Sequence, residues 1–254
     1  WTIDQQKLST INFTPSTVTI ENIKNFSYPT PDEKQKQPGY QNDTFEYDKV
    51  KNVWFFQNDF VEPLGAHTFL TFEFEDNKYL SFSAEIRKET GESYSPFRGL
   101  FNHYELQYML VTEKDILTLR AGLREPDVYM YKLNLNNNEK VNLFKSVLVR
   151  ADMVNKKPEF YNTYSNACTT NIVYHLNQML DTDKKPGNSW KVTFPKYSDE
   201  FLYEKNLIDT GLNFAEIKQS SRINDKVKEA LKNNLDDVDF SKFIRQNHSQ
   251  EVQG

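Results

Sequence analysis

The sequence contains a single cysteine, and its eight glycines are scattered through 254 residues. One thiol cannot close an internal disulfide, so the cysteine content does not identify the redox compartment and leaves Cys168 free for chemistry. The glycines form no phosphate-binding loop. No apolar run approaches the roughly 18 residues needed to span a bilayer, and no signal peptide is visible after Trp1. We therefore expect any signal or anchor segment to be absent from this chain.

The sequence also lacks a cluster of positive charge. The formal net charge is −5, and Lys and Arg are dispersed rather than gathered into a stripe that engages phosphates, so we expect no nucleic-acid partner. Four dispersed histidines without H-E-x-x-H spacing predict no metal site, and no motif indicates a cofactor. The chain is instead rich in aromatics, because 19 Phe and 14 Tyr supply bulk for a sizeable core in one large domain, residues 1–254.

Hydrophobic patterning divides the chain into three parts and indicates the α+β class. Residues 1–50 read as an irregular lead-in that is poor in strands, except for a short one at 17–23. Residues 183–254 read as a polar, partly helical C-terminal extension. The catalytic core between them, 51–182, has runs typical of strands at 53–57, 66–74, 79–87, 103–111 and from 127, and helical spacing over 141–151 and 172–180. Residues 112–120 fit either a strand or a short helix.

The hairpin predicted over 66–88 places His67 beside Glu85. Two sets of its apolar residues are even-numbered, so they share one face and the odd-numbered positions line the other: Leu70, Phe72 and Phe74 on the first run, and Leu80, Phe82, Ala84 and Ile86 on the second. If residues 75–77 form the turn, His67 lies directly across from Glu85, and if 76–78 form it, the two are diagonal neighbours. Either register brings the imidazole and the carboxylate close enough to interact.

Cys168 lies in the segment YSNACTTNIVYHLNQML, which spans residues 164–180. The apolar residues that follow Cys168 have helical spacing, and either Asn166 or Ser165 is a suitable N-cap, so we expect Cys168 in the first turn of a helix. Unpaired backbone N–H groups and the helix dipole favour an anion at that position. Both effects lower the pKa of a thiol and raise its thiolate population.

A nucleophilic cysteine needs a base that is oriented by a third group, and His67 with Glu85 supplies that pair. His103, at the start of another predicted strand, is the alternative base. His175 lies seven residues beyond Cys168, roughly 10 Å along the helix axis, which is too far for direct proton transfer. A structural reading also stays open, in which Cys168 is a small buried hydrophobe and His67 is hydrogen-bonded within the sheet.

Five stretches, in this order, resemble the N-terminal periplasmic domain of Lnb-type lipoprotein N-acyltransferases: AHTFLTFEF, YLSFSAEIRKETGESYSPFRGLF, YELQYMLVTEKDILTLR, DVYMYKL and PEFYNTYSNACTTNI. The order of a His strand, a polar strand and a Cys helix is also similar to a circularly permuted NlpC/P60, papain-like fold. That resemblance implies an antiparallel sheet with the nucleophile at the N-terminus of a packed helix. It implies Cys168 as nucleophile, His67 as base and Glu85 as the residue that orients the base. Ala167 departs from the family, which usually has Asn there.

The resemblance implies thiol-dependent acyl transfer through a cysteine thioester in the bacterial cell envelope. The implied partners are a phospholipid acyl donor, a lipoprotein acceptor and a membrane surface, and the implied location is the periplasm. We also expect Asn166, Arg87 and Arg98 to contact the substrate. Two other functions stay open: a cysteine peptidase or amidase of the NlpC/P60 type, and a non-catalytic envelope module that binds lipids or proteins and buries Cys168.

Overall fold

A single sheet of eight strands forms the centre of the computed structural model, which describes residues 1–28, 39–60, 65–124, 126–181, 184–187, 189–208 and 211–246. The strand order is β1-β2-β7-β6-β5-β4-β8, and β3 pairs with β2 outside this path. The strands are β1 (Thr10–Phe13), β2 (Thr17–Lys24), β3 (Tyr40–Glu46), β4 (Val50–Asp59), β5 (Ala66–Phe74), β6 (Tyr79–Arg87), β7 (Glu105–Val111) and β8 (Val128–Lys132). β5 is buried along its whole length, as expected for a central strand that is covered on both faces.

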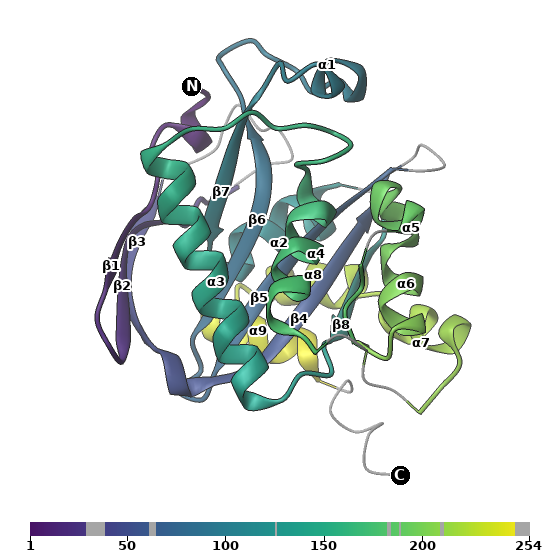
Figure 1. Cartoon of the computed structure of the whole chain (residues 1–254). Coiled ribbons are helices and arrows are strands. Elements are labelled where there is room, and N and C mark those ends of the chain that lie inside the picture. The colour runs from purple at the N-terminus through teal and green to yellow at the C-terminus, as the bar shows by residue number, and fades with distance from the viewer. Residues whose placement is uncertain are drawn as a thin grey trace.

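Helices cover both faces of this sheet (Figure 1). α3 and α4 pack with the larger hydrophobic core on one face, and α2, α8 and α9 enclose a second core on the other. α1 projects beyond one end of the sheet (Figure 1). The helices are α1 (Pro96–Leu100), α2 (Glu113–Leu117), α3 (Asn137–Lys156), α4 (Cys168–Met179), α5 (Trp190–Thr193), α6 (Ser198–Glu204), α7 (Phe214–Ser220), α8 (Asn224–Lys232) and α9 (Asp237–Arg245). The predicted α+β class is therefore confirmed.

The register of the β5–β6 hairpin selects one of the two predicted turns. Leu70 pairs with Phe82, and Glu73 pairs with Tyr79, so residues 75–77 form the turn. In both strands the even-numbered apolar residues face α3, as the alternation predicts.

The two strands of this hairpin separate beyond Leu70 and Phe82, where their described pairing ends. β5 continues to Ala66 beside β4, while β6 continues to Arg87 beside β7. Each strand therefore follows its outer neighbour, and the two backbones diverge at the end that carries His67. Figure 1 shows β5 and β6 diverging toward that end, with α4 lying over the gap.

Two of the expectations for the lead-in and the sheet are wrong. Residues 1–50 are not an irregular lead-in, because β1, β2 and β3 lie there and extend the sheet at one side. The sheet is not purely antiparallel, because Lys24 of β2 pairs with Val111 of β7 in the parallel direction.

The short strand expected at 17–23 is confirmed as β2. Residues 112–120 begin as a helix, and the Thr112 side chain caps it by accepting a hydrogen bond from the Asp115 N–H at 3.3 Å.

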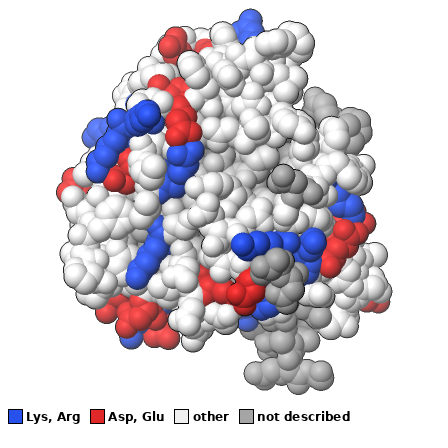
Figure 2. Space-filling view, viewed as in Figure 1, with Lys and Arg blue, Asp and Glu red and all other residues white. Residues whose placement is uncertain are grey.

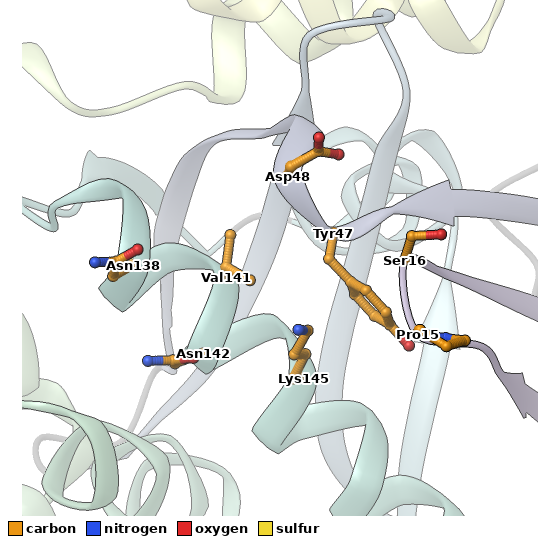
Figure 3. Close-up of a pocket in the computed structure, with 8 residues that line it drawn as sticks. All are labelled: Pro15, Ser16, Tyr47, Asp48, Asn138, Val141, Asn142 and Lys145. Atoms are coloured by element: carbon orange, nitrogen blue, oxygen red, sulfur yellow. The ribbon is translucent and has the colours of Figure 1, made fainter.

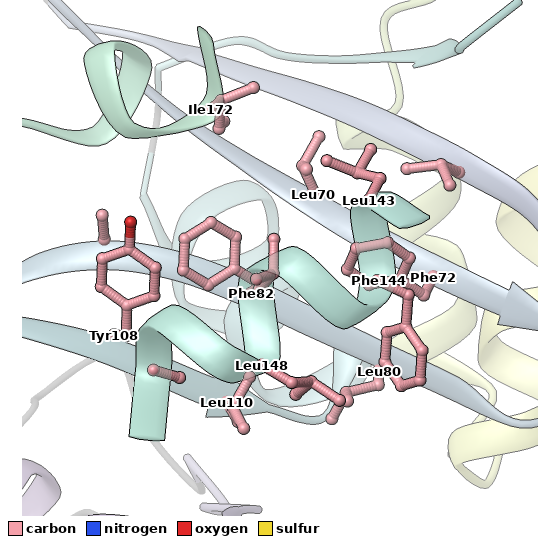
Figure 4. Packing of buried hydrophobic residues seen from close by; sticks show 14 of the residues in the cluster. Leu70, Phe72, Leu80, Phe82, Tyr108, Leu110, Leu143, Phe144, Leu148 and Ile172 are labelled. Atoms are coloured by element: carbon pink, nitrogen blue, oxygen red, sulfur yellow. The ribbon is translucent and has the colours of Figure 1, made fainter. Parts of the chain in front are cut away.

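The core on the α3 face is built around Phe144. Its ring contacts that of Phe72 on β5, with centroids 5.0 Å apart (Figure 4). It also contacts the rings of Phe74 on β5 at 5.2 Å and Phe45 on β3 at 6.2 Å. Burying one such side chain contributes roughly 1.5–3 kcal/mol. This packing fixes α3 to the sheet, and α3 in turn supports α4, which begins at Cys168.

Candidate active site

Cys168 is the first residue of α4. The N-cap is Ala167, not Asn166 or Ser165 as expected, because Ala167 keeps an extended backbone and its N–H donates to Thr170 Oγ1 at 2.8 Å. The thiol therefore lies at the start of a helix of 12 residues, next to the unpaired N–H groups of the first turn. This confirms the predicted location in the first turn, with a different cap.

The turn before Cys168 is held by the Asn171 side chain from inside the helix. Asn171 Nδ2 donates to Ala167 O at 2.8 Å and to Asn166 Oδ1 at 2.9 Å, while Tyr108 Oη donates to Asn171 Oδ1 at 2.6 Å. Asn166 Nδ2 donates to Phe160 O at 3.0 Å. Both ends of the Asn166 amide are thus engaged by protein groups, so Asn166 shapes the turn in this structure.

The His67 imidazole lies near the Cys168 thiol, where its charge and hydrogen bonding lower the pKa of that thiol. On the other side of its ring, Nε2 lies 2.7 Å from Ser83 Oγ and 3.0 Å from Glu85 Oε1. These contacts leave Nδ1 as the ring nitrogen available to the sulfur. His67 and Cys168 are both buried, with 7% and 4% of their surface exposed, so the pair is shielded from bulk water. The three predicted residues therefore lie in one connected chain.

The His67 and Cys168 side chains come from opposite faces of the sheet. The His67 ring stacks on that of Phe69, which belongs to the core on the α8 face, whereas α4 packs on the α3 face. They meet where β5 and β6 are no longer paired. Thr68 and Thr169, the neighbours of His67 and Cys168, join β5 to α4 there through hydroxyls 2.9 Å apart.

Arg120 completes the chain behind Glu85 and has no counterpart among the predicted site residues. Its Nη2 donates to Glu85 Oε1 at 2.5 Å, and Ser83 Oγ donates to the same oxygen at 2.8 Å. Arg120 lies on a π-helical segment, Thr118–Leu123, that directly follows α2. Such segments are rare and are frequent at functional sites. No motif links Arg120 to Glu85, which precedes it by 35 residues.

These contacts shift the pKa of each group. Burial raises the pKa of Cys168, but the His67 charge and the hydrogen bonds from His67 and the Thr68 N–H outweigh it and bring this pKa to about 7. Burial and the Arg120 charge lower the pKa of His67, yet Glu85 and Cys168 raise it above its ordinary value. Burial raises the pKa of Glu85, but His67 and Arg120 hold it well below its usual range. A thiolate and an imidazolium can therefore form near neutral pH.

Tyr161 is a second residue that the sequence did not single out. Its side chain is buried, and burial followed by the Cys168 charge raises the pKa of the phenol, so the hydroxyl stays protonated near the sulfur. It also forms a hydrogen bond with Tyr94. The only signal for Tyr161 in the sequence is its position seven residues before Cys168. A protonated phenol beside the nucleophile is a hydrogen-bond donor for an oxyanion.

The two arginines expected to bind substrate lie in different settings. Arg87 forms an ion pair with Glu105 at 2.8 Å, donates to Gln5 O at 3.2 Å and stacks over the Trp1 ring. Its guanidinium therefore anchors the N-terminal residues to β6. Arg98 is exposed on α1, outside the chain of contacts around Cys168.

The two other described histidines are separate from the thiol. His103 is 47% exposed at its side chain and pairs with Glu92 at 3.2 Å. His175 is fully buried, with Ser146 Oγ 2.7 Å from Nδ1 and Tyr108 Oη 3.1 Å from Nε2. Burial, followed by the Arg150 charge, lowers the pKa of His175 to about 3, so its ring stays neutral.

No metal cluster marks the described part of this site. The described residues contain no group of three or more His, Cys, Asp or Glu placed to hold a metal ion. A groove of about 560 Å³ lies elsewhere, beside the first half of α3 and the β1–β2 turn (Figure 3). It is lined by Pro15, Ser16, Tyr47, Asp48, Asn138, Val141, Asn142 and Lys145.

Comparison with known proteins points to one family. A family model described as the Lnb N-terminal periplasmic domain matches residues 36–196, a range that contains His67, Glu85, Arg120 and Cys168. No curated protein and no solved structure matches the chain. Over the described residues, we find no helix with the length and apolar content to cross a bilayer. The family indicates a periplasmic, lipoprotein-related context in the cell envelope. Since the match covers more than half of the sequence, the chain belongs to the Lnb N-terminal periplasmic domain family.

Proposed function

We propose that this domain catalyses acyl transfer through a thioester on Cys168, from a phospholipid donor to the amino terminus of a lipoprotein. The observation that carries the proposal is the placement of the buried Cys168 thiol beside the His67 imidazole, whose Nε2 lies 3.0 Å from Glu85 Oε1. A nucleophile, a base and a group that orients the base are what thiol acyl transfer requires. The donor and the acceptor are inferred from the resemblance to Lnb-type acyltransferases.

In the first half-reaction His67 accepts the proton of the Cys168 thiol, and the thiolate attacks the carbonyl carbon of the donor ester. The oxyanion that forms lies within reach of the Cys168 backbone N–H at the start of α4 and of the Tyr161 hydroxyl. Collapse of this intermediate breaks the ester C–O bond. His67 returns its proton to the leaving alkoxide, which departs as the lysophospholipid alcohol and leaves the acyl group on sulfur.

In the second half-reaction the lipoprotein amine attacks the thioester carbonyl. His67 accepts the proton that the amine loses, and the C–S bond breaks to give an amide and the Cys168 thiolate. Glu85 stabilises the imidazolium in both halves, because its pKa is held well below the usual range and it stays ionised. Arg120 keeps Glu85 in place through its hydrogen bond to Oε1.

The arrangement also supports a permuted papain-like fold as part of this proposal. The strand with the base precedes the helix with the nucleophile, and that helix packs against the sheet by its N-terminal turn. A peptidase or amidase would use the same groups and differ only in the acyl donor and in water as acceptor. The identity of the acyl group on Cys168 therefore decides between the two activities.

The test is to capture the acyl-enzyme and weigh it. The protein is incubated with vesicles or short-chain micelles of phosphatidylethanolamine of known acyl composition, without an amine acceptor, and its intact mass is measured. We expect a fatty-acyl mass on Cys168 that hydroxylamine removes and that Cys168→Ser lacks. His67→Gln is expected to slow its formation at least 100-fold, whereas His103→Gln serves as the matched control and leaves it unchanged.

The other outcomes of this mass measurement distinguish a peptidase from a structural cysteine. A peptide mass trapped on Cys168 from peptidoglycan fragments or peptide esters supports the peptidase. If the thiol gains no adduct from lipid or peptide donors while the protein is folded, Cys168 is structural and acyl transfer by this domain is excluded.

A further inference from the structure

Six apolar side chains form an exposed cluster on α1 and on the loop that leads into α4. Phe97 and Phe101 are 69% and 70% exposed, with ring centroids 5.0 Å apart, and Phe160 and Tyr164 are 63% and 64% exposed. Aromatic side chains of this size are usually removed from water, and adjoining exposed ones mark interaction sites. We call the cluster the apolar cap; it consists of Tyr94, Phe97, Leu100, Phe101, Phe160 and Tyr164.

The apolar cap is attached directly to the segment that carries the nucleophile. Thr163 N donates to Gly99 O at 3.2 Å, and Thr163 Oγ1 donates to Pro96 O at 3.0 Å. Gly99 permits this close approach, because a Cβ added there would lie 2.2 Å from Thr163 Oγ1 and 3.5 Å from the Tyr161 ring. Tyr161 belongs to the same loop, which leads into Cys168. The cap therefore lies at the end of the molecule where α4 begins (Figure 1).

The charges around the cap favour a lipid headgroup. From Ser93 to Phe101 the chain reads SYSPFRGLF, with no acidic residue and with Arg98 as its only basic one. Arg98 is exposed and forms no ion pair with any described residue, whereas the nearby acid Glu92 is paired with His103. Figure 2 shows a surface around the projecting α1 that is almost free of charged side chains. Aromatic and aliphatic side chains next to a cation are typical of segments that lie in the membrane interface.

We propose that the apolar cap docks on a phospholipid bilayer. Phe97, Leu100 and Phe101 enter the boundary between headgroups and acyl chains, and Arg98 pairs with a lipid phosphate. The proposal deepens the proposed function and rests on it for the role of the lipid as acyl donor, because docking brings the donor to the end of the sheet that contains Cys168. A bilayer suits the cap because its exposed aromatic and aliphatic side chains match the apolar boundary of the membrane and the exposed Arg98 beside them matches the lipid phosphates.

The docking test measures how the protein partitions onto large unilamellar vesicles of phosphatidylethanolamine and phosphatidylglycerol in a 3:1 ratio, by sedimentation. All proteins carry Cys168→Ser, so no acyl transfer contributes to the binding. We expect Phe97→Ser with Phe101→Ser to lower the partition coefficient about tenfold or more, because two exposed rings no longer enter the interface. Val149→Ser with Met153→Ser is the matched control, because that pair has the same i, i+4 spacing and is 48% and 54% exposed on α3. The control is expected to bind like the parent.

A second variant tests the charge. Arg98→Gln is expected to lower partitioning severalfold on the anionic vesicles and to reduce its dependence on salt, while Arg98→Lys restores most of both. Partitioning of the Phe97→Ser, Phe101→Ser protein equal to the parent overturns the proposal. The proposal is also overturned if the parent does not bind the vesicles but forms a dimer that the double substitution dissociates. That result would show that the cap binds a second copy of the chain. Acyl-enzyme formation from a short-chain micellar donor reports on the proposed function separately, since it does not require docking on a bilayer.

Discussion

The Cys168 thiol and the His67 imidazole interact although their side chains come from opposite faces of the central sheet. They can meet because β5 and β6 stop pairing after Leu70 and Phe82, so the hairpin backbone no longer separates the α3 face from the α8 face there. The imidazole approaches from the α8 face, and the first turn of α4 approaches from the α3 face. A strand separation at the end of one hairpin is thus the structural basis of the candidate site.

The first expected outcome concerns the ionisation of Cys168. Its pKa is lowered to about 7, so the rate of alkylation by iodoacetamide should rise with pH around a midpoint near 7. Burial raises the pKa of Cys168, and in the His67→Gln variant no imidazole charge opposes this effect. The midpoint should then move above the ordinary thiol value of about 8.5. The measurement is the second-order labelling rate between pH 5.5 and 10, followed by mass spectrometry.

Two controls make this profile decisive. The protein unfolded in urea should titrate near the ordinary thiol value, and His103→Gln should keep the midpoint of the parent. If His67→Gln leaves the midpoint near 7, the imidazole does not control the thiol, and the assignment of His67 as base is lost.

The second outcome concerns the coupling of Arg120 to Glu85. Their side chains are 8% and 17% exposed, so Arg120→Met leaves a largely buried carboxylate with one cationic partner fewer. We expect the free energy of unfolding at pH 7 to fall by about 3 kcal/mol. Glu85→Gln should also destabilise the protein, because it leaves the guanidinium unpaired. The double variant should lose clearly less than the sum of the two single losses.

The pH dependence of this effect follows from the lowered pKa of Glu85. A carboxylate with a depressed pKa in the folded state stabilises the protein above its unfolded pKa, about 4.3, and loses that contribution as the pH falls. The gap in unfolding free energy between parent and Glu85→Gln should therefore narrow below about pH 4.3. Urea unfolding at pH 3.5, 4.5 and 7 measures it. A gap that widens toward low pH, or strictly additive losses in the cycle, is incompatible with the Arg120–Glu85 pair.

The third outcome separates the two candidate bases. His103 lies on the surface beside Glu92, so replacing it with Gln should change the rate of acyl-enzyme formation less than twofold. The same change at His67 should lower that rate by at least 100-fold, because the proton acceptor is lost. Single-turnover kinetics with a short-chain phospholipid provide both numbers. Comparable losses in the two variants would show that neither imidazole acts alone as the base.

Local patterning was sufficient to predict the hairpin and the Cys helix. Alternation in β5 and β6 allowed two registers, both with His67 near Glu85, and the structure has the one with a turn at 75–77. Helical spacing after Cys168 predicted α4. These features depend on residues close together in the sequence, so the period of the apolar residues is enough to find them.

The remaining features depend on contacts between distant segments. β2 joins the sheet through a parallel pair with β7, and no local pattern encodes a partner 87 positions away at Val111. Arg120 belongs to the site because a π-helical segment turns its side chain toward Glu85. The N-cap was misplaced because propensity favours Asn, whereas the hydroxyl of Thr170 satisfies the N–H of Ala167. Each of these outcomes is decided by tertiary packing.

The last expected outcome concerns His175, which lies on the Cys helix but is separate from the thiol. Its pKa is lowered to about 3 by burial and then by the Arg150 charge, whereas in the unfolded chain it is near 6.5. The unfolded state therefore binds a proton that the folded state does not, so the contribution of His175 is complete above about pH 6.5 and is lost as the pH falls. The loss approaches about 1.4 kcal/mol per pH unit below that value. His175→Gln, which cannot titrate, should be less stable than the parent at pH 7 and should approach the parent's stability by pH 5 in urea unfolding.

The same variant should keep the Cys168 alkylation midpoint near 7, because the His175 ring contacts Ser146 and Tyr108 rather than the sulfur. A stability difference that does not change between pH 5 and 7 would mean that the His175 ring has the same pKa in the folded and unfolded states, so that burial does not lower it.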